Sequence, residues 1–167
     1  MADFYGNTAD FRAYIDSRNY DIPNTTTDPD IEAALLVASE WLDNTYRSYF
    51  RSLKTGGRAQ IREWPRIGIV DMYGYPIGNN EIPREIIQAT YELTIRQIKI
   101  PGSLTVDYTP GKYSQVAVSG AVSVTYASFN SAYDVQTQMP IIDSILAALL
   151  FDDGQKLSGL SGDAVRV

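Results

Sequence analysis

Residues 63–83 read EWPRIGIVDMYGYPIGNNEIP, and this stretch decides how the rest of the chain is arranged. It places three prolines and three glycines between two segments of helical periodicity, and these residues end helices and favour turns. It contains none of the residue patterns typical of an enzyme's site. The stretch therefore predicts a structural joint between two helices.

Helices are predicted on both sides of this joint. Upstream, an apolar 3–4 spacing predicts a helix over 29–50, capped by Asp28 and with Pro29 in its first position. Its apolar surface is wider than one stripe, which favours packing against two partners. Downstream, a helix is predicted over 83–99, opened by Pro83 and stopped at residues 101–102.

Two shorter helices are predicted near the ends of the chain. The first covers residues 9–18, and either Thr8 or Asp10 is expected to cap it. The last covers residues 140–151 and is apolar around most of its circumference, so it is expected to be buried in this core or against another chain.

Residues 103–127 carry the pattern of β structure. Apolar residues fall on every second position from Val116 to Tyr126, with Gly120 as the predicted bend. The predicted fold is therefore mainly α (α+β): a small bundle of about four helices with a β-hairpin or small antiparallel sheet inserted between the third and last helices. We expect one domain over 1–151 and a mobile tail over 152–167, suited to act as a partner-docking arm.

Composition excludes several classes of function. The 167-residue chain has 44% apolar and 20% charged residues, as in ordinary folded proteins. It has no cysteine and no histidine, which removes disulfides, thiolate nucleophiles and the commonest general base and metal ligands. No apolar run is long enough for a membrane span, and no signal peptide is evident. We expect no enzyme, no cofactor, no metal and no membrane partner.

Local motifs support no catalytic or metal site. GKYS at 111–114 lacks the upstream glycine of a phosphate-binding loop and is interpreted as a hairpin turn. Asp28, Asp30 and Glu32 fit helix capping far better than a calcium loop. Glu81 and Glu85 lie near a helix start, where carboxylates are expected without any acid–base role.

The net charge of −6 is unevenly distributed. Residues 47–66 hold six basic side chains and one acidic one, whereas the rest of the chain holds 8 basic and 19 acidic ones. An acidic body with one basic segment suits an acidic protein partner or a second copy, although a solvated helix end and loop would explain it equally well. Tyrosines such as Tyr46 and Tyr73 accompany the basic segment and could stack bases, but tyrosines at core margins and protein interfaces are the favoured interpretation.

Taken together, residues 8–150 resemble a phage family, and the resemblance is most specific over 34–95. The pattern resembles the head–tail connector adaptor, or head completion, proteins of tailed double-stranded DNA phages, a group often catalogued as DnaT-like single-stranded-DNA-binding proteins. The residues that carry the resemblance are Ala38, Ser39, Leu42, Asp43, Tyr46, Phe50, Arg58, Gln60, Trp64, Pro65, Arg66, Asp71, Gly74, Ile77, Ile82 and Pro83. The apolar helix opened by Pro140 is also similar, and the loop over 52–57 departs from the pattern by being looser and longer.

The resemblance implies a structural role in the virion. Such adaptors form a twelve-subunit ring below the portal vertex, extend the DNA channel and present a platform for the stopper or tail. The implied partners are other copies of the chain, the portal protein, the next neck or tail protein and double-stranded DNA that passes without sequence-specific contacts. The implied location is the virion neck, after assembly in the host cytoplasm. The alternatives are a single-stranded-DNA-binding protein and another neck ring such as a tail terminator.

Two sets of residues are predicted to matter. In the joint we expect Trp64 to be wedged between the second and third helices, Pro65 to break the approach and Arg66 to pair with a carboxylate. The full predicted joint comprises Trp64, Pro65, Arg66, Asp71, Gly74 and Pro83. The candidate subunit or portal interface comprises Arg47, Arg51, Arg58, Arg62, Leu146, Leu150, Phe151 and Arg166.

Overall fold

The computed structural model describes residues 3–105, 115–118, 122–125 and 139–150. Four α-helices dominate these residues: α1 (Thr8–Ser17), α2 (Asp28–Tyr46), α3 (Arg84–Lys99) and α4 (Pro140–Leu146). A short 3-10 helix, η1 (Gly57–Ala59), lies in the long loop between α2 and α3. The described chain is thus mainly helical, as predicted.

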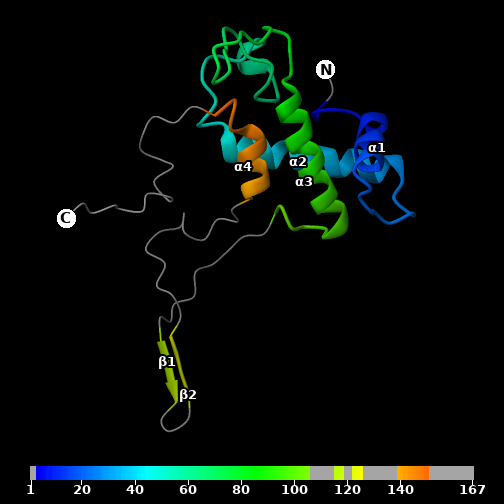
Figure 1. Cartoon of the computed structure of the whole chain (residues 1–167), viewed down its shortest axis with the longest axis vertical. Helices are drawn as coiled ribbons and strands as arrows, with labels where there is room; N and C mark the ends of the chain where they lie inside the picture. Colours follow the sequence, from blue (N-terminus) through cyan, green and yellow to red (C-terminus); the bar gives the residue numbers. More distant parts are fainter. Residues whose placement is uncertain (1–2, 106–114, 119–121, 126–138, 151–167) are drawn as a thin grey trace, which may run out of the picture.

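The two longest helices form the centre of the molecule. Figure 1 shows α3 lying across α2, with α1 on one side and α4 on the other. The α2–α3 contact is the most extensive, α4 packs on α3, and α1 packs on α2. The loop between α2 and α3 covers one end of this arrangement (Figure 1).

Two apolar clusters make up the core, and α2 contributes to both. One cluster joins α1 to the first half of α2 and to α3, through Phe11, Ile15, Ile31, Leu35, Tyr91 and Ile95. The larger cluster joins the second half of α2 to α3, α4 and the long loop, and includes Leu42, Phe50, Trp64, Ile86, Leu93 and Leu146. The wide apolar surface predicted for α2 is therefore used on two sides.

The caps of the first two helices differ from those predicted. Thr27, not Asp28, caps α2: its hydroxyl accepts from the Asp30 N–H, and the Asp30 carboxylate accepts from the Thr27 N–H at 2.9 Å. This reciprocal arrangement needs a three-residue spacing, which Asp28 does not have with an acidic or amide partner. Asn7, rather than Thr8 or Asp10, caps α1, because its side-chain oxygen accepts from the Asp10 N–H at 2.8 Å.

Two helices end earlier than predicted. α2 ends at Tyr46 rather than at residue 50, since the chain turns there and Phe50 folds back edge-on against Trp64, with ring centroids 5.6 Å apart. α4 ends at Leu146, and turns carry the chain to Leu150. By contrast α3 begins one residue after Pro83, which is its N-cap, and ends at Lys99 as predicted.

Two short strands lie between α3 and α4 in the sequence. β1 (Gln115–Val118) pairs antiparallel with β2 (Val122–Thr125), with Gln115 opposite Thr125 and Val118 opposite Val122. Most of the predicted β region, including the GKYS turn and the Gly120 bend, lies outside the described residues. Beyond this pair of strands, the rest of the predicted β region stays a prediction, as does the tail over 152–167.

Candidate functional site

A buried polar network anchors the predicted joint to the helices. Tyr5 is fully buried; its N–H donates to the Ser39 hydroxyl at 3.0 Å and its own hydroxyl donates to the Asp43 carboxylate at 2.6 Å. The same Tyr5 oxygen accepts from the Trp64 N–H at 3.0 Å. The Tyr5 side chain thus joins α2 to the joint. Burial and the nearby Asp43 carboxylate raise the pKa of Tyr5 above its ordinary value, so its hydroxyl keeps its proton and remains a donor.

Arg62 shares the Asp43 carboxylate with Tyr5. The Arg62 guanidinium lies 3.3 Å from Asp43 Oδ2 and 3.5 Å from Glu40 Oε1, and the Glu63 N–H also donates to Asp43 at 3.3 Å. Burial raises the pKa of Asp43 from 3.8 to about 6, while the hydrogen bond from Tyr5 and the charge of Arg62 oppose that rise. Arg62 was predicted at an interface, but it is 7% exposed and pairs within its own chain.

We expect Asp43 to make the stability of the protein fall as pH rises from about 4 to 7. Because its pKa is raised in the folded state, the native protein binds more protons than the unfolded chain between pH 3.8 and about 6. Relative to Asp43→Asn, the wild-type free energy of unfolding should drop by on the order of 3 kcal/mol across this range. Urea denaturation of both proteins at several pH values measures this difference. A carboxyl-carbon NMR titration of Asp43 with a midpoint below pH 4 would contradict the assignment.

Arg66 lies inside a cage of main-chain oxygens. Its guanidinium donates to the carbonyls of Arg51 at 2.8 Å, Ser52 at 2.6 Å, Glu63 at 3.2 Å and Phe50 at 3.4 Å. It also donates to the Glu63 carboxylate at 2.8 Å, which confirms the predicted carboxylate partner. A planar group with five donors can satisfy this many acceptors at once, so Arg66 ties both ends of the loop together.

Gln60 adds a second tie inside the same loop. Its amide nitrogen donates to the carbonyls of Arg62 and Pro65, at 2.9 and 3.0 Å, and its amide oxygen accepts from the Gly56 N–H at 2.8 Å. Lys54 donates to the Gln60 carbonyl at 2.8 Å. The long loop therefore has an internal hydrogen-bonded structure although it contains little regular secondary structure.

Trp64 fills the space between this loop and the helices. It is 1% exposed and belongs to the larger apolar cluster, which includes residues of α2, α3 and α4. Pro65 follows it through a cis peptide bond and is buried, and Pro83 is also buried at the start of α3. The joint predicted from the sequence is therefore a packed feature of the described structure.

A tight turn, called here the tyrosine turn (Asp71–Tyr75), projects from the loop. One Asp71 carboxylate oxygen accepts from the N–H groups of Tyr73 at 2.9 Å and Tyr75 at 2.8 Å, and Gly74 has a positive φ of 86°. The Met72 N–H donates to the carbonyl of Ala148, just after α4, at 2.9 Å. Asp71 and Gly74 thus determine the conformation of this turn, and the Met72–Ala148 hydrogen bond attaches it to the segment just after α4.

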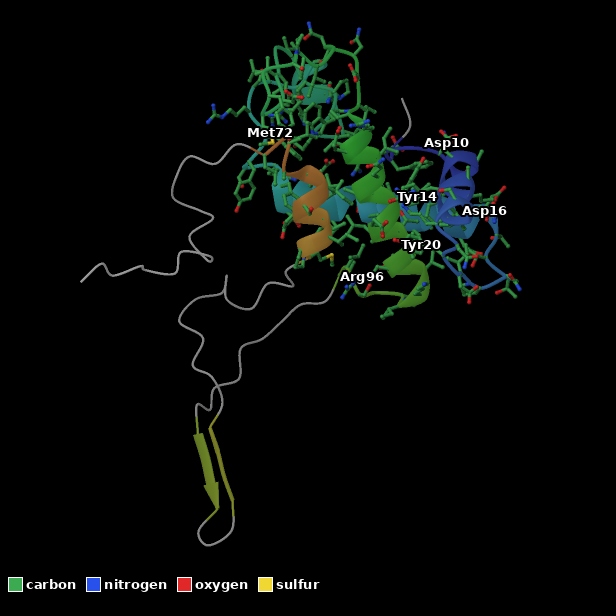
Figure 2. All side chains as sticks on the ribbon, viewed as in Figure 1. Asp10, Tyr14, Asp16, Tyr20, Met72 and Arg96 are labelled. Atoms are coloured by element: carbon green, nitrogen blue, oxygen red, sulfur yellow. The ribbon has the colours of Figure 1, made fainter. Side chains whose placement is uncertain are left out.

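The loop exposes a large share of the apolar side chains at the surface. Of the nine large hydrophobic side chains exposed in the described residues, seven lie between residues 53 and 75. We call this set the apolar loop surface; it consists of Leu53, Ile61, Ile67, Val70, Met72, Tyr73 and Tyr75. Figure 2 shows Met72 on this part of the molecule, away from Asp10 and Asp16 on α1. Seven exposed apolar side chains in one loop make it a candidate protein-binding region, since exposed apolar groups that lie together on a surface mark such regions.

The other predicted interface residues differ in their exposure to solvent. Arg47, Arg51 and Arg58 are exposed, and Arg47 donates to Asn44 on its own helix. Leu146 is fully buried in the core, so its side chain faces its own chain, and Leu150 is half-buried. Phe151 and Arg166 lie outside the described residues.

Sequence reasoning gave too little weight to three of the residues that build the site. Asp43 and Gln60 were part of the family pattern without an assigned role, and Tyr5 was not singled out. A polar residue on an apolar helix stripe, such as Asp43 four positions after Ser39, does signal a buried polar contact. Nothing near Tyr5 in the sequence signals its contacts, which join residues 34 to 59 positions apart.

The described part of the chain, residues 3–105, 115–118, 122–125 and 139–150, offers neither a metal cluster nor a membrane-spanning helix. Within these ranges no group of three or more acidic, histidine or cysteine side chains could hold a metal ion. No helix there is long and apolar enough to cross a membrane.

Comparison with known proteins agrees with part of the sequence resemblance. No curated protein and no solved structure matches the chain. A family model described as "Putative DnaT-like ssDNA binding protein" matches residues 1–167, the whole chain. With a match of this extent, the chain belongs to that DnaT-like family.

Proposed function

We propose that this protein is a structural component of a phage virion, a head–tail connector adaptor. In this role it forms a ring below the portal vertex, extends the DNA channel and provides the platform on which the next neck or tail protein docks. The apolar loop surface carries the proposal. Seven exposed apolar side chains on a loop held from within by Arg66, Gln60 and Trp64 are what a preformed protein-binding surface requires.

The remaining parts of the proposal follow from the same role. The partners are further copies of the chain, twelve in a ring, the portal protein, and a stopper or tail protein. Genomic double-stranded DNA passes through the channel without sequence-specific contacts, which the acidic net charge favours because it limits binding to phosphates. The β-insertion between α3 and α4 belongs to the same adaptor domain, and the protein has no catalytic role.

The use of the basic segment supports a protein partner over a nucleic acid. Lys54, Arg62 and Arg66 all donate to groups of their own chain, and the last two are buried. The six basic residues of 47–66 therefore do not make one continuous basic face. The exposed side chains of the loop are mostly apolar or aromatic. Arg47, Arg51 and Arg58 are also exposed there.

Negative-stain imaging with the portal protein encoded in the same genome tests the proposal. We expect an added ring of density at the narrow end of the portal. Leu53→Asp, which puts a charge on the apolar loop surface, should lower ring occupancy at least ten-fold, whereas Ser48→Asp, at another exposed position, should not. Bare portals beside free protein would count against the adaptor role, and a ring found only at the end of isolated tails would favour a tail terminator.

The second candidate function is binding of single-stranded DNA. The family description names it, and the exposed Tyr73 and Tyr75 side chains are of the kind on which bases stack. It requires salt-sensitive binding of an oligonucleotide that weakens when both tyrosines are replaced by alanine. Fluorescence anisotropy with labelled oligonucleotide measures this. Absence of salt-sensitive binding by the wild-type protein would count against this candidate, and binding that survives both replacements would exclude the two tyrosines as its site.

A further inference from the structure

A short segment near the N-terminus, called here the N-terminal strap (residues 5–7), contacts both the helices and the loop between α2 and α3. It has no regular secondary structure, and Figure 1 shows it in dark blue, leading into α1. Tyr5 is fully buried in the cluster that also contains Trp64, whereas Asn7 is exposed. The strap is thus an irregular segment with one deeply buried side chain.

Three helices hold the strap. The Tyr5 N–H donates to the Ser39 hydroxyl on α2 at 3.0 Å, and the Asn7 N–H donates to the Tyr91 hydroxyl on α3 at 3.3 Å. Gly6 has a positive φ of 80°, and a Cβ atom there would lie 2.5 Å from Tyr91 Cε1, so the main chain runs directly against this ring. Asn7 then caps α1.

A single hydroxyl group connects the strap to the loop. It donates from Tyr5 to Asp43 Oδ1 at 2.6 Å and accepts from the Trp64 N–H at 3.0 Å. The other oxygen of the Asp43 carboxylate accepts from the Arg62 guanidinium and from the Glu63 N–H. The Tyr5 hydroxyl therefore lies between α2 and residues 62–64 of the loop.

The hydrogen bonds of Tyr5 couple release of the strap to opening of the loop. If Tyr5 left its site, the Trp64 N–H would lose its acceptor and the Asp43 carboxylate would lose a donor, and all three residues are buried. A buried polar group without a partner costs free energy, so release of the strap favours opening of the loop. Coupling between two equilibria is reciprocal, so a closed loop also favours a bound strap.

The helical frame does not depend on either segment. The contact between α2 and α3 is the most extensive of those between the described elements, so both helices can stay folded while the strap and the loop open. Local opening of irregular segments costs less free energy than unfolding of packed helices. The loop bears the apolar loop surface, which is a preformed binding surface only when the loop is closed.

We propose that the N-terminal strap is a conformational clamp on the binding loop. The Tyr5 hydroxyl positions the loop through Trp64, and a partner protein that binds the apolar loop surface in turn fixes the strap. This inference deepens the proposed function, on which its second half rests, by naming Tyr5 as a positioning residue of the binding surface. Tyr5 itself is buried and touches no partner.

Hydrogen–deuterium exchange of the full-length protein tests the first half. Tyr5→Phe keeps the ring and removes the hydroxyl, so the amides of residues 53–77 should exchange about ten-fold faster, while those in the middle of α2 and α3 stay within about two-fold of wild type. Tyr14→Phe is the matched control. The Tyr14 hydroxyl, on α1 (Figure 2), donates to Glu92 on α3 at 2.7 Å, and its removal should leave exchange of the loop unchanged.

A second variant tests whether the effect passes through the strap. The Ser39 hydroxyl accepts from the Tyr5 N–H and donates to the Leu35 carbonyl of its own helix. Ser39→Ala should therefore speed exchange in the strap and, through Tyr5, in residues 53–77. Faster exchange in the strap alone would overturn the coupling. An unchanged loop in Tyr5→Phe, or a uniform rise that includes α2 and α3, would overturn it as well.

Exchange on the portal complex tests the second half and separates it from the proposed function. In wild-type rings on the portal, the Tyr5 and Asn7 amides should exchange about ten-fold slower than in the free protein, whereas in Tyr5→Phe rings only the loop should be protected. Rings without protection of the strap, or with equal protection in both proteins, overturn the coupling and leave the adaptor role standing. Absence of wild-type rings counts against the adaptor role, while exchange in the free variants still decides whether Tyr5 positions the loop.

Discussion

Replacing Trp64 with alanine should lower the free energy of unfolding by about 3–5 kcal/mol, a large share of what a domain of this size has. Trp64 is 1% exposed, packs edge-on against Phe50 and belongs to the cluster that joins α2 to α3. Alanine leaves a cavity there, because the hydrogen bonds of Tyr5 and Arg66 hold the surrounding loop in place and limit its collapse. Urea denaturation measures the loss, as a lower midpoint with an unchanged dependence of the unfolding free energy on urea concentration.

The chain offers a control of the same residue type. Trp41, the only other tryptophan, lies half-buried on α2 at the edge of the same cluster, so Trp41→Ala should cost clearly less. Tyr73→Ala, at a position 73% exposed, should stay within about 0.5 kcal/mol of wild type. If Trp64→Ala unfolds at the wild-type urea concentration, or costs no more than Trp41→Ala, Trp64 does not anchor the joint.

The helical frame could be predicted from the sequence because its signals are local. Apolar residues at 3–4 spacing mark α2 and α3, and Pro83 and the residues at 101–102 mark the ends of α3. The errors were also local. A capping box formed by Thr27 and Asp30 took the place of Asp28, and the contact of Phe50 with Trp64 ended α2 four residues early.

The site was only partly predictable, because its contacts join distant parts of the chain. The turn residues and Trp64 stand out locally, and so does the need of Arg66 for a carboxylate. The link from Tyr5 to Asp43 and Trp64 spans 38 and 59 residues, and no local pattern encodes it. The number of basic residues in 47–66 likewise does not tell which of these side chains are buried and which are exposed. Only the packing of the folded chain shows that Arg62 and Arg66 are buried.

Because Arg66 is buried, its replacement by lysine should also lower the free energy of unfolding by a large amount. Arg66→Lys keeps the charge but should cost about 3–5 kcal/mol, because one ammonium cannot reach acceptors that the planar guanidinium contacts from three nitrogens. The ammonium could keep only part of the contacts that Arg66 makes with the Glu63 carboxylate and with the carbonyls of residues 50–52, so several of these acceptors would lose their donor. Urea denaturation measures the global effect of this change.

Limited trypsin digestion separates loss of the loop from loss of the whole fold. If Arg66 mainly fixes the loop that bears the apolar loop surface, Arg66→Lys should speed cleavage after the exposed Arg58 well before α2 and α3 are cut. Arg58→Lys provides the control, since it keeps a trypsin site on the same loop and should stay within about 0.5 kcal/mol of wild type. Were Arg66→Lys as stable and as resistant as Arg58→Lys, the cage of carbonyls would not hold the loop, and a preformed binding surface would lose its physical basis.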